Sequence, residues 1–198
     1  MAFSDVFNVD KQLSFYGAYH SNSINILIHV ICVPMILWSF QVFVAPLPVP
    51  SFIPAYHYAI NDYLALSTNW AAIMGVVYLA YYYILEPIAA LLYTPQMILM
   101  VLNATSFSER PGYINTAVAV HACSWIAQFV GHGFAEGRAP ALLDNLVGAV
   151  VLAPFFVHLE ILFTLGYRPA MQKRINNAVG MEITRIRKAE GDKKRKAE

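Results

Sequence analysis

Charged residues are scarce in most of this chain. Between Gln12 and Tyr167, 156 residues include only eight aspartates, glutamates, lysines and arginines. So few charges cannot cover the surface of a water-soluble globule of this size, although they suit a surface that faces lipid. Together with 58% hydrophobic residues overall, this predicts an integral membrane protein. The eight charged residues are Asp62, Glu86, Glu109, Arg110, Glu136, Arg138, Asp144 and Glu160.

The sequence also lacks several motifs that would indicate a disulfide framework, a secretory signal or a known cofactor site. The only two cysteines, Cys32 and Cys123, lie in apolar segments, so we expect no disulfide framework. The N-terminal residues have no basic stretch typical of a secretory signal, so insertion would depend on internal spans. The sequence has no HExxH, CxxC, Gly-rich phosphate loop, or haem, flavin or nicotinamide motif. Nucleic acid is not an expected partner, because the basic tail lacks interleaved aromatics and adjoins an apolar segment.

Apolar runs predict an all-α, polytopic membrane helix bundle. A helical span needs about 20 apolar residues. Four strong spans are expected, together with one or two weak segments that could be re-entrant or lie flat on the membrane. The strong spans involve residues 24–45, 70–85, 113–135 and 141–166, and the weak segments are 55–67 and 88–107, the latter broken near Thr94-Pro95.

The chain ends in a basic segment. Ten of the 13 lysines and arginines lie between Arg168 and Lys196. We therefore predict a membrane-embedded domain over 1–167, the part of the chain that would hold any catalytic site, and a basic helix and tail over 168–198, which the positive-inside rule places in the cytosol. The terminal "KRKAE" resembles a dilysine retrieval signal of the endoplasmic reticulum, and a simple solubilising charge run explains it equally well.

Polar residues inside the apolar body form two clusters. The first is a stripe of His121, Trp125, Gln128, His132 and Glu136 at relative positions 0, 4, 7, 11 and 15. At about 100° per residue these side chains share one helix face. His132 and Glu136 are one turn apart and could share a metal ion or a proton. His121 is about 16 Å along a straight helix from His132, too far to share its ion.

The second cluster lies at the start of the first span. Asn22, Asn25 and His29 fall at positions 0, 3 and 7 and share one helix face. On a continuous helix His20 would point away from His29. The two histidines can therefore serve one site only if the helix begins near Asn22 or Ser23, which would leave His20 in the entering loop.

These residues leave more than one function open. His20, His29 and His132 with Glu136 form a set that suits Fe(II), Zn(II) or Mn(II). The presence of the same residues is also explained by hydrogen bonds between helices or by a role in proton transfer. On the residues alone, a proton-coupled carrier that uses the stripe and a non-catalytic membrane scaffold of the endoplasmic reticulum stand beside a metalloenzyme.

The two clusters carry long motifs. They are Y-H-x-N-x-x-N-x-x-x-H in "FYGAYHSNSINILIH" and W-x-x-Q-F-x-G-H-x-x-x-E in "WIAQFVGHGFAE". With these motifs the chain, from 13 to about 166, resembles the fungal 2-hydroxy fatty acid dioxygenases of the endoplasmic reticulum, a family known from phytosphingosine breakdown. The resemblance implies a multi-pass protein of that membrane.

The resemblance also implies an activity. A 2-hydroxy long-chain fatty acid would be shortened by one carbon in an Fe(II)-dependent α-oxidation, with molecular oxygen as the oxidant. Carried over motif by motif, the catalytic residues and iron ligands would be His20, His29, His132 and Glu136. The acyl chain would lie between spans, in contact with the bilayer in which the substrate dissolves.

Other residues receive supporting roles. Asn25 and Gln128 are expected to orient the imidazoles. His121 falls outside the motif pattern, and Arg138 is the nearest base that could anchor a substrate carboxylate. Glu160, deep in the last span, is expected to pair with Arg138 or with a ligand histidine.

Overall fold

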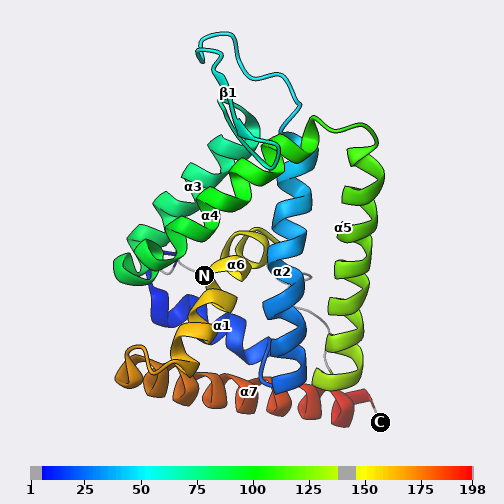
Figure 1. Cartoon of the computed structure of the whole chain (residues 1–198). Helices are drawn as coiled ribbons and strands as arrows, with labels where there is room; N and C mark the ends of the chain where they lie inside the picture. The colour runs from blue at the N-terminus through cyan, green and yellow to red at the C-terminus, as the bar shows by residue number, and fades with distance from the viewer. Residues whose placement is uncertain (1–5, 138–145, 198) are drawn as a thin grey trace.

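The computed structural model describes residues 6–137 and 146–197, which form a bundle of long helices above two helices that lie across its base (Figure 1). Helices α2 and α5 stand side by side and run in opposite directions, α3 and α4 form a second antiparallel pair, and α6 lies between the pairs. The elements are α1 (Val9–Tyr19), α2 (Ser23–Val44), β1 (His57–Asn61), β2 (Leu64–Ser67), α3 (Trp70–Leu85), α4 (Pro87–Ser108), α5 (Tyr113–Val130), the π-helix η2 (Gly131–Glu136), α6 (Leu146–Thr164) and α7 (Pro169–Ala197).

The two basal helices, α1 and α7, pack against each other. The two helices lie close together at Gly17, where an added Cβ would lie 2.7 Å from the Val179 side chain. The apolar side of α7 contributes Met171 and Ile175 to the core, while its many lysines and arginines account for the basic tail. The start of α7 at Pro169 lies close to the predicted boundary at 168.

The weak segment 55–67 is not a helical span but an antiparallel β-hairpin at the end of the bundle opposite α1 and α7. A local hydrogen bond stabilises the turn of the hairpin: the Asn61 side chain accepts from the Tyr63 backbone amide at 2.8 Å. The Asn103 amide on α4 donates to the Tyr63 carbonyl at 3.1 Å and holds the hairpin against the helix. The short apolar run therefore satisfies its backbone by pairing rather than by crossing a membrane.

The second weak segment, 88–107, is a better candidate for a membrane span than the sequence predicted. It forms one continuous helix, α4, of 22 residues with Pro95 inside it. Thr94 donates its hydroxyl to the Ala90 carbonyl at 2.8 Å, and the helix continues past the proline as membrane helices often do. In the described part of the chain α2 and α4 are long and apolar enough to cross a membrane, so four strong spans are not shown.

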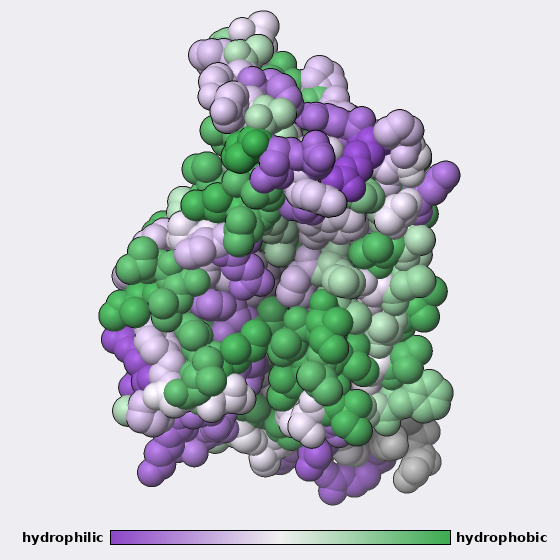
Figure 2. Space-filling view, in the orientation of Figure 1, coloured by the Kyte–Doolittle hydropathy of each residue, from purple (hydrophilic) through white to green (hydrophobic). Residues whose placement is uncertain are grey.

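Large apolar side chains cover much of the outer surface. Leu27 and Ile31 on α2, Leu91 on α4 and Ile126 on α5 are each more than half exposed. Figure 2 shows hydrophobic residues gathered over the helices of the bundle and hydrophilic ones at the base, where α7 lies. Soluble monomers rarely expose apolar areas this large, and the surface with its two apolar helices is compatible with a membrane protein. Both cysteines are free, as predicted.

A buried carboxylate ties two helix junctions together. Glu86, between α3 and α4, is only 4% exposed. It accepts a hydrogen bond from the Tyr167 hydroxyl at 2.9 Å and pairs with the guanidinium of Arg168, both at the junction of α6 and α7. Because a buried charge without its partner is costly, this ion pair fixes the base of the bundle to the α3–α4 turn.

Replacing this carboxylate should destabilise the fold. We expect Glu86→Gln to lower the free energy of unfolding by about 1–3 kcal/mol, a range that allows for solvent around the half-exposed Arg168. Thermal unfolding in detergent measures the change. The matched control is Glu182→Gln, which removes an exposed ion pair with Arg185 within α7 and should leave the melting temperature unchanged. Equal melting temperatures for the two variants would contradict the role of Glu86.

Candidate metal centre and substrate pocket

The chain breaks its helix between His20 and His29, and the break brings the two side chains together. His20 ends α1 as its C-cap, and α2 begins at Ser23 after the N-cap Asn22, whose side chain accepts a hydrogen bond from the Ile24 amide at 2.9 Å. The predicted helix start between the two histidines is confirmed. Their ring centroids are 4.4 Å apart.

The third histidine comes from the other motif. The helix predicted over 113–135 changes after Val130 into the π-helix η2, a wider turn that often marks functional sites. This turn points His132 at the other two rings, with centroids 4.8 Å from His20 and 4.9 Å from His29. All three side chains are buried, and their ligand atoms lie within 4.8 Å of one another. The structure thus brings together the three histidines that the motifs predicted.

Backbone carbonyls fix two of these imidazoles. His20 donates from Nδ1 to the Tyr16 carbonyl at 2.8 Å, and His29 donates from Nδ1 to the Asn25 carbonyl at 2.9 Å. Each ring therefore carries its proton on Nδ1 and keeps the Nε2 lone pair for a ligand. The Nδ1 atom of His132 is buried and has no hydrogen-bond partner within the described residues.

This donor set fits a divalent transition metal. Burial and the neighbouring His29 lower the pKa of His20 well below its ordinary value, so its imidazole is neutral at physiological pH. Neutral imidazole is the form that binds metal. The three histidines could therefore hold a metal ion, and their chemistry does not by itself identify which one.

Glu136 lies beside this cluster, at the N-terminus of α2. Its carboxylate accepts from the Ser21 amide at 3.1 Å, the Ser21 hydroxyl at 2.5 Å, the Asn22 amide at 2.9 Å and the Asn25 side-chain amide at 3.3 Å. Burial acts to raise the pKa of Glu136, but the hydrogen bonds that it accepts outweigh burial and hold the pKa below its usual range. Its part as an iron ligand stays a prediction, while the contacts describe a helix cap.

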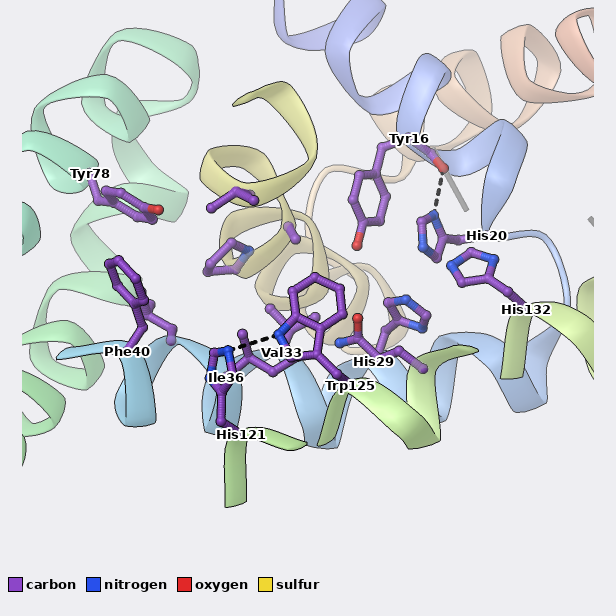
Figure 3. Close-up of a pocket in the computed structure, with 15 residues that line it drawn as sticks. Tyr16, His20, His29, Val33, Ile36, Phe40, Tyr78, His121, Trp125 and His132 are labelled. Atoms are coloured by element: carbon purple, nitrogen blue, oxygen red, sulfur yellow. Dashed lines mark hydrogen bonds between the residues drawn. The ribbon is translucent and has the colours of Figure 1, made fainter. Parts of the chain in front are cut away.

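A pocket of about 260 Å³ opens from the histidines along the inside of the bundle. Figure 3 shows His20, His29 and His132 at one end and Phe40 and Tyr78 at the other. Four members of the predicted polar stripe, His121, Trp125, Gln128 and His132, line this pocket and Glu136 does not; most of the remaining lining is apolar. The lining residues are Tyr16, His20, His29, Val33, Ile36, Leu37, Phe40, Tyr78, His121, Trp125, Gln128, His132, Val150, Ala153 and Pro154.

His121 belongs to the far part of the pocket. One ring nitrogen, Nδ1, is 2.9 Å from the Ser39 hydroxyl, and Nε2 accepts a hydrogen bond from the Trp125 indole at 3.0 Å. Ser39 is ten residues beyond His29 on α2, a rise of about 15 Å. The structure places His121 away from the three clustered histidines, as its sequence distance predicted, and both of its nitrogens have partners.

The other predicted residues have different neighbours. Asn25 supports His29 through its backbone, whereas its side chain contacts Glu136. Gln128 lines the pocket, and its Nε2 has no hydrogen-bond partner in the part of the chain that the structure describes. Glu160, on α6, interacts electrostatically with Tyr16. Arg138 lies outside the described residues.

Tyr16 is a site residue that no sequence argument singled out. Its ring stacks on that of His20 at a centroid distance of 3.9 Å and an interplanar angle of 8°, and Phe156 packs on its ring at 4.0 Å. Together with the hydrogen bond to its carbonyl, this stacking holds the His20 ring in place. The signal available in the sequence was an aromatic residue four positions before the histidine.

Fold and site together define a helical protein with a candidate metal centre at the end of an apolar pocket. Over residues 6–165 its sequence matches the family described as 2-hydroxy-palmitic acid dioxygenase Mpo1-like, and the chain belongs to this family. It is 32% identical over 183 residues to the 2-hydroxy-palmitic acid dioxygenase MPO1 of Saccharomyces cerevisiae, covering 89% of this chain and 92% of the yeast protein. These matches confirm the resemblance inferred from the motifs. No solved structure matches significantly.

The two motifs meet through a close backbone contact at Gly131. A Cβ added there would lie 2.7 Å from the Asn25 Oδ1 atom and 3.0 Å from Ile28 Cδ1, both on α2. Two residues further along η2, a Cβ on Gly133 would meet nothing within 4 Å. An alanine at 131 would therefore force the ends of the Asn25 and Ile28 side chains, or η2 itself, to shift, whereas glycine lets η2 lie this close to α2.

This difference gives a matched pair of variants. Gly131→Ala should push η2 away from α2, lower the free energy of unfolding by about 1–3 kcal/mol and reduce bound metal, because overpacking shifts the backbone that carries His132. Gly133→Ala should keep both properties near the parent values. Elemental analysis of the purified proteins and thermal unfolding test this, and indistinguishable variants would show that the contact does not align the histidines.

Proposed function

We propose that this protein is a dioxygenase that shortens 2-hydroxy fatty acids by one carbon, with a ferrous ion held by His20, His29 and His132. The observation that carries the proposal is the convergence of three buried imidazoles at one end of a mostly apolar pocket. Membership of the 2-hydroxy-palmitic acid dioxygenase family supports the substrate class and the use of molecular oxygen.

Iron is the metal that best joins this donor set to the chemistry of the family. Histidine-rich sites with open positions are the usual setting of non-haem iron oxygenases. When bound, a ferrous ion would supply the redox chemistry that dioxygen requires and positions for the carboxylate and hydroxyl of the hydroxy acid. The requirement for both groups accounts for the choice of 2-hydroxylated over plain fatty acids, since a plain acid loses one contact.

Backbone groups and one carboxylate orient the imidazoles, and apolar side chains line the rest of the pocket. The carbonyls of Tyr16 and Asn25 hold His20 and His29 as Nδ1–H tautomers, so that neither ring needs to turn or lose a proton to bind metal. Glu136 holds the start of α2, and hence His29, against η2. The apolar lining beyond His29 takes the acyl chain, whose burial contributes about 0.8 kcal/mol per methylene.

The apolar surface supports a membrane setting for this reaction. Helices α2 and α4 are long enough to cross a bilayer, and a long-chain hydroxy acid dissolves in the same phase. We place the protein in the endoplasmic reticulum membrane, with the basic α7 on the cytosolic side.

The contacts favour an enzyme over a proton-coupled carrier. A carrier of the predicted kind would use the stripe from His121 to Glu136 as a path for protons. The members of the stripe have separate tasks instead: His121 is bonded to Ser39 and Trp125, and Glu136 caps α2.

Metal content and turnover test the proposal directly. Purified protein should contain about one iron per chain and consume oxygen when given 2-hydroxypalmitate, and His132→Ala should lose most of both because one of three ligands is gone. His57→Ala is the control, because His57 is half exposed on β1 and pairs with Glu109 far from the site. A parent protein without bound metal in any preparation, or without oxygen consumption after reconstitution with Fe(II), would sink the proposal.

The pocket makes a separate prediction about chain length. Ile36 lines its middle, so Ile36→Trp should obstruct long acyl chains and lower kcat/KM for 2-hydroxypalmitate at least tenfold, while short-chain 2-hydroxy acids are affected little. Ile31→Trp, at an exposed position on the outer side of α2, is the control and should change neither. Equal losses for long and short substrates in Ile36→Trp would mean that the acyl chain lies elsewhere.

A further inference from the structure

Gln128 presents a hydrogen-bond donor that the protein does not use. The residue lies on α5 one helical turn before His132, and its side chain is 7% exposed. Its Nε2 atom is buried without a hydrogen-bond partner among the described residues, although Gln128 lines the pocket. A buried donor left without a partner costs about 1–3 kcal/mol, so such a group in a pocket points to a ligand that accepts its hydrogen bond.

The clustered imidazoles are not the acceptor. The Nδ1 atoms of His20 and His29 are protonated and already donate to backbone carbonyls. If each ring binds the metal through one nitrogen, as the proposed function requires, the second nitrogen of His132 carries a proton, and no nitrogen of the three rings accepts from an amide. Orientation of the rings, the role expected for Gln128 from the sequence, is thus carried out by backbone groups.

The charge of the pocket narrows the choice of ligand. Among the described lining residues there is no lysine and no arginine, so a bound carboxylate would meet no basic side chain. His121, the other polar side chain deeper in the pocket, has partners on both ring nitrogens. The Gln128 amide is a donor without a partner among the described residues, and it is available to an anionic head group near the three histidines.

We propose that Gln128 Nε2 donates a hydrogen bond to a carboxylate oxygen of the bound 2-hydroxy acid. The inference rests on the proposed function, to which it adds the protein group that recognises the acid. It also gives the pocket a direction: the head group lies between Gln128 and the histidines, and the acyl chain runs from there toward Phe40 and Tyr78 (Figure 3).

Binding measured without turnover tests this assignment. In the absence of oxygen, the iron-loaded protein in detergent is titrated calorimetrically with 2-hydroxypalmitate and with hexadecane-1,2-diol, which keeps the hydroxyl and lacks the carboxylate. Gln128→Met preserves the volume and removes the donor, so the Kd for 2-hydroxypalmitate should rise about 10- to 100-fold. Gln128→Glu should raise it further, because two carboxylates then face each other. The Kd for the diol should change less than threefold in Gln128→Met.

The control is a second buried glutamine. Gln41 on α2 is fully buried, bonds to the Met97 sulfur at 3.5 Å and does not line the pocket, so Gln41→Met should leave both Kd values unchanged. Iron content is measured for every variant.

Three results would overturn the inference: an unchanged Kd for 2-hydroxypalmitate in Gln128→Met, an equal rise for acid and diol, or loss of iron from that variant. The first two would leave the proposed function standing if the parent protein binds and oxidises the acid. A parent protein that neither binds nor oxidises it would remove both proposals.

Discussion

The carboxylate of Glu136 joins two segments of the chain that are more than a hundred residues apart, and the site depends on that connection. It accepts hydrogen bonds from the amides of Ser21 and Asn22, which the first turn of α2 cannot satisfy within its own helix. A negative charge at this end of a helix also opposes the helix dipole favourably. Since His29 lies on α2 and His132 on η2, the same bonds that cap the helix set the distance between two imidazoles.

This arrangement has an electrostatic consequence for the proposed centre. A carboxylate committed to four donors at the helix start is a poor ligand for a cation, and the three imidazoles are neutral. A divalent ion among them would therefore keep its full charge in a buried and mostly apolar pocket, where an anionic ligand is strongly favoured. The substrate carboxylate would supply the compensating negative charge, and the Gln128 amide would donate a hydrogen bond to one of its oxygens.

Periodicity in the sequence was sufficient to predict much of this site. Nine residues of continuous helix would point the His20 and His29 side chains in opposite directions, and this predicted the helix break between them. The spacing of His121, Gln128 and His132 predicted that they share one helix face. What could not be predicted depends on contacts between distant segments. The bonds of Glu136, the stacking of Tyr16 on His20 and the π-turn at Gly131 require α1, α2 and η2 to be packed. The hairpin at 57–67 was missed because its strands are short and apolar, which a helical segment also allows.

The antiparallel order of α2 and α5 explains why polar residues gather at the start of the apolar helix α2. Because the two segments run in opposite directions, His29 near the start of α2 lies beside His132 on η2. Further along α2, Ser39 lies beside His121 on α5. The two polar pairs stand about 15 Å apart, with Trp125, Gln128 and mostly apolar side chains between them. An amphiphile with one polar head and a long chain matches the end at His29, where the Gln128 amide has no partner among the described residues, and not the end at His121, whose ring nitrogens are both bonded to protein. Among the described residues, the two ends of the pocket therefore differ in whether their polar groups already have hydrogen-bond partners, and not in how many polar groups they contain.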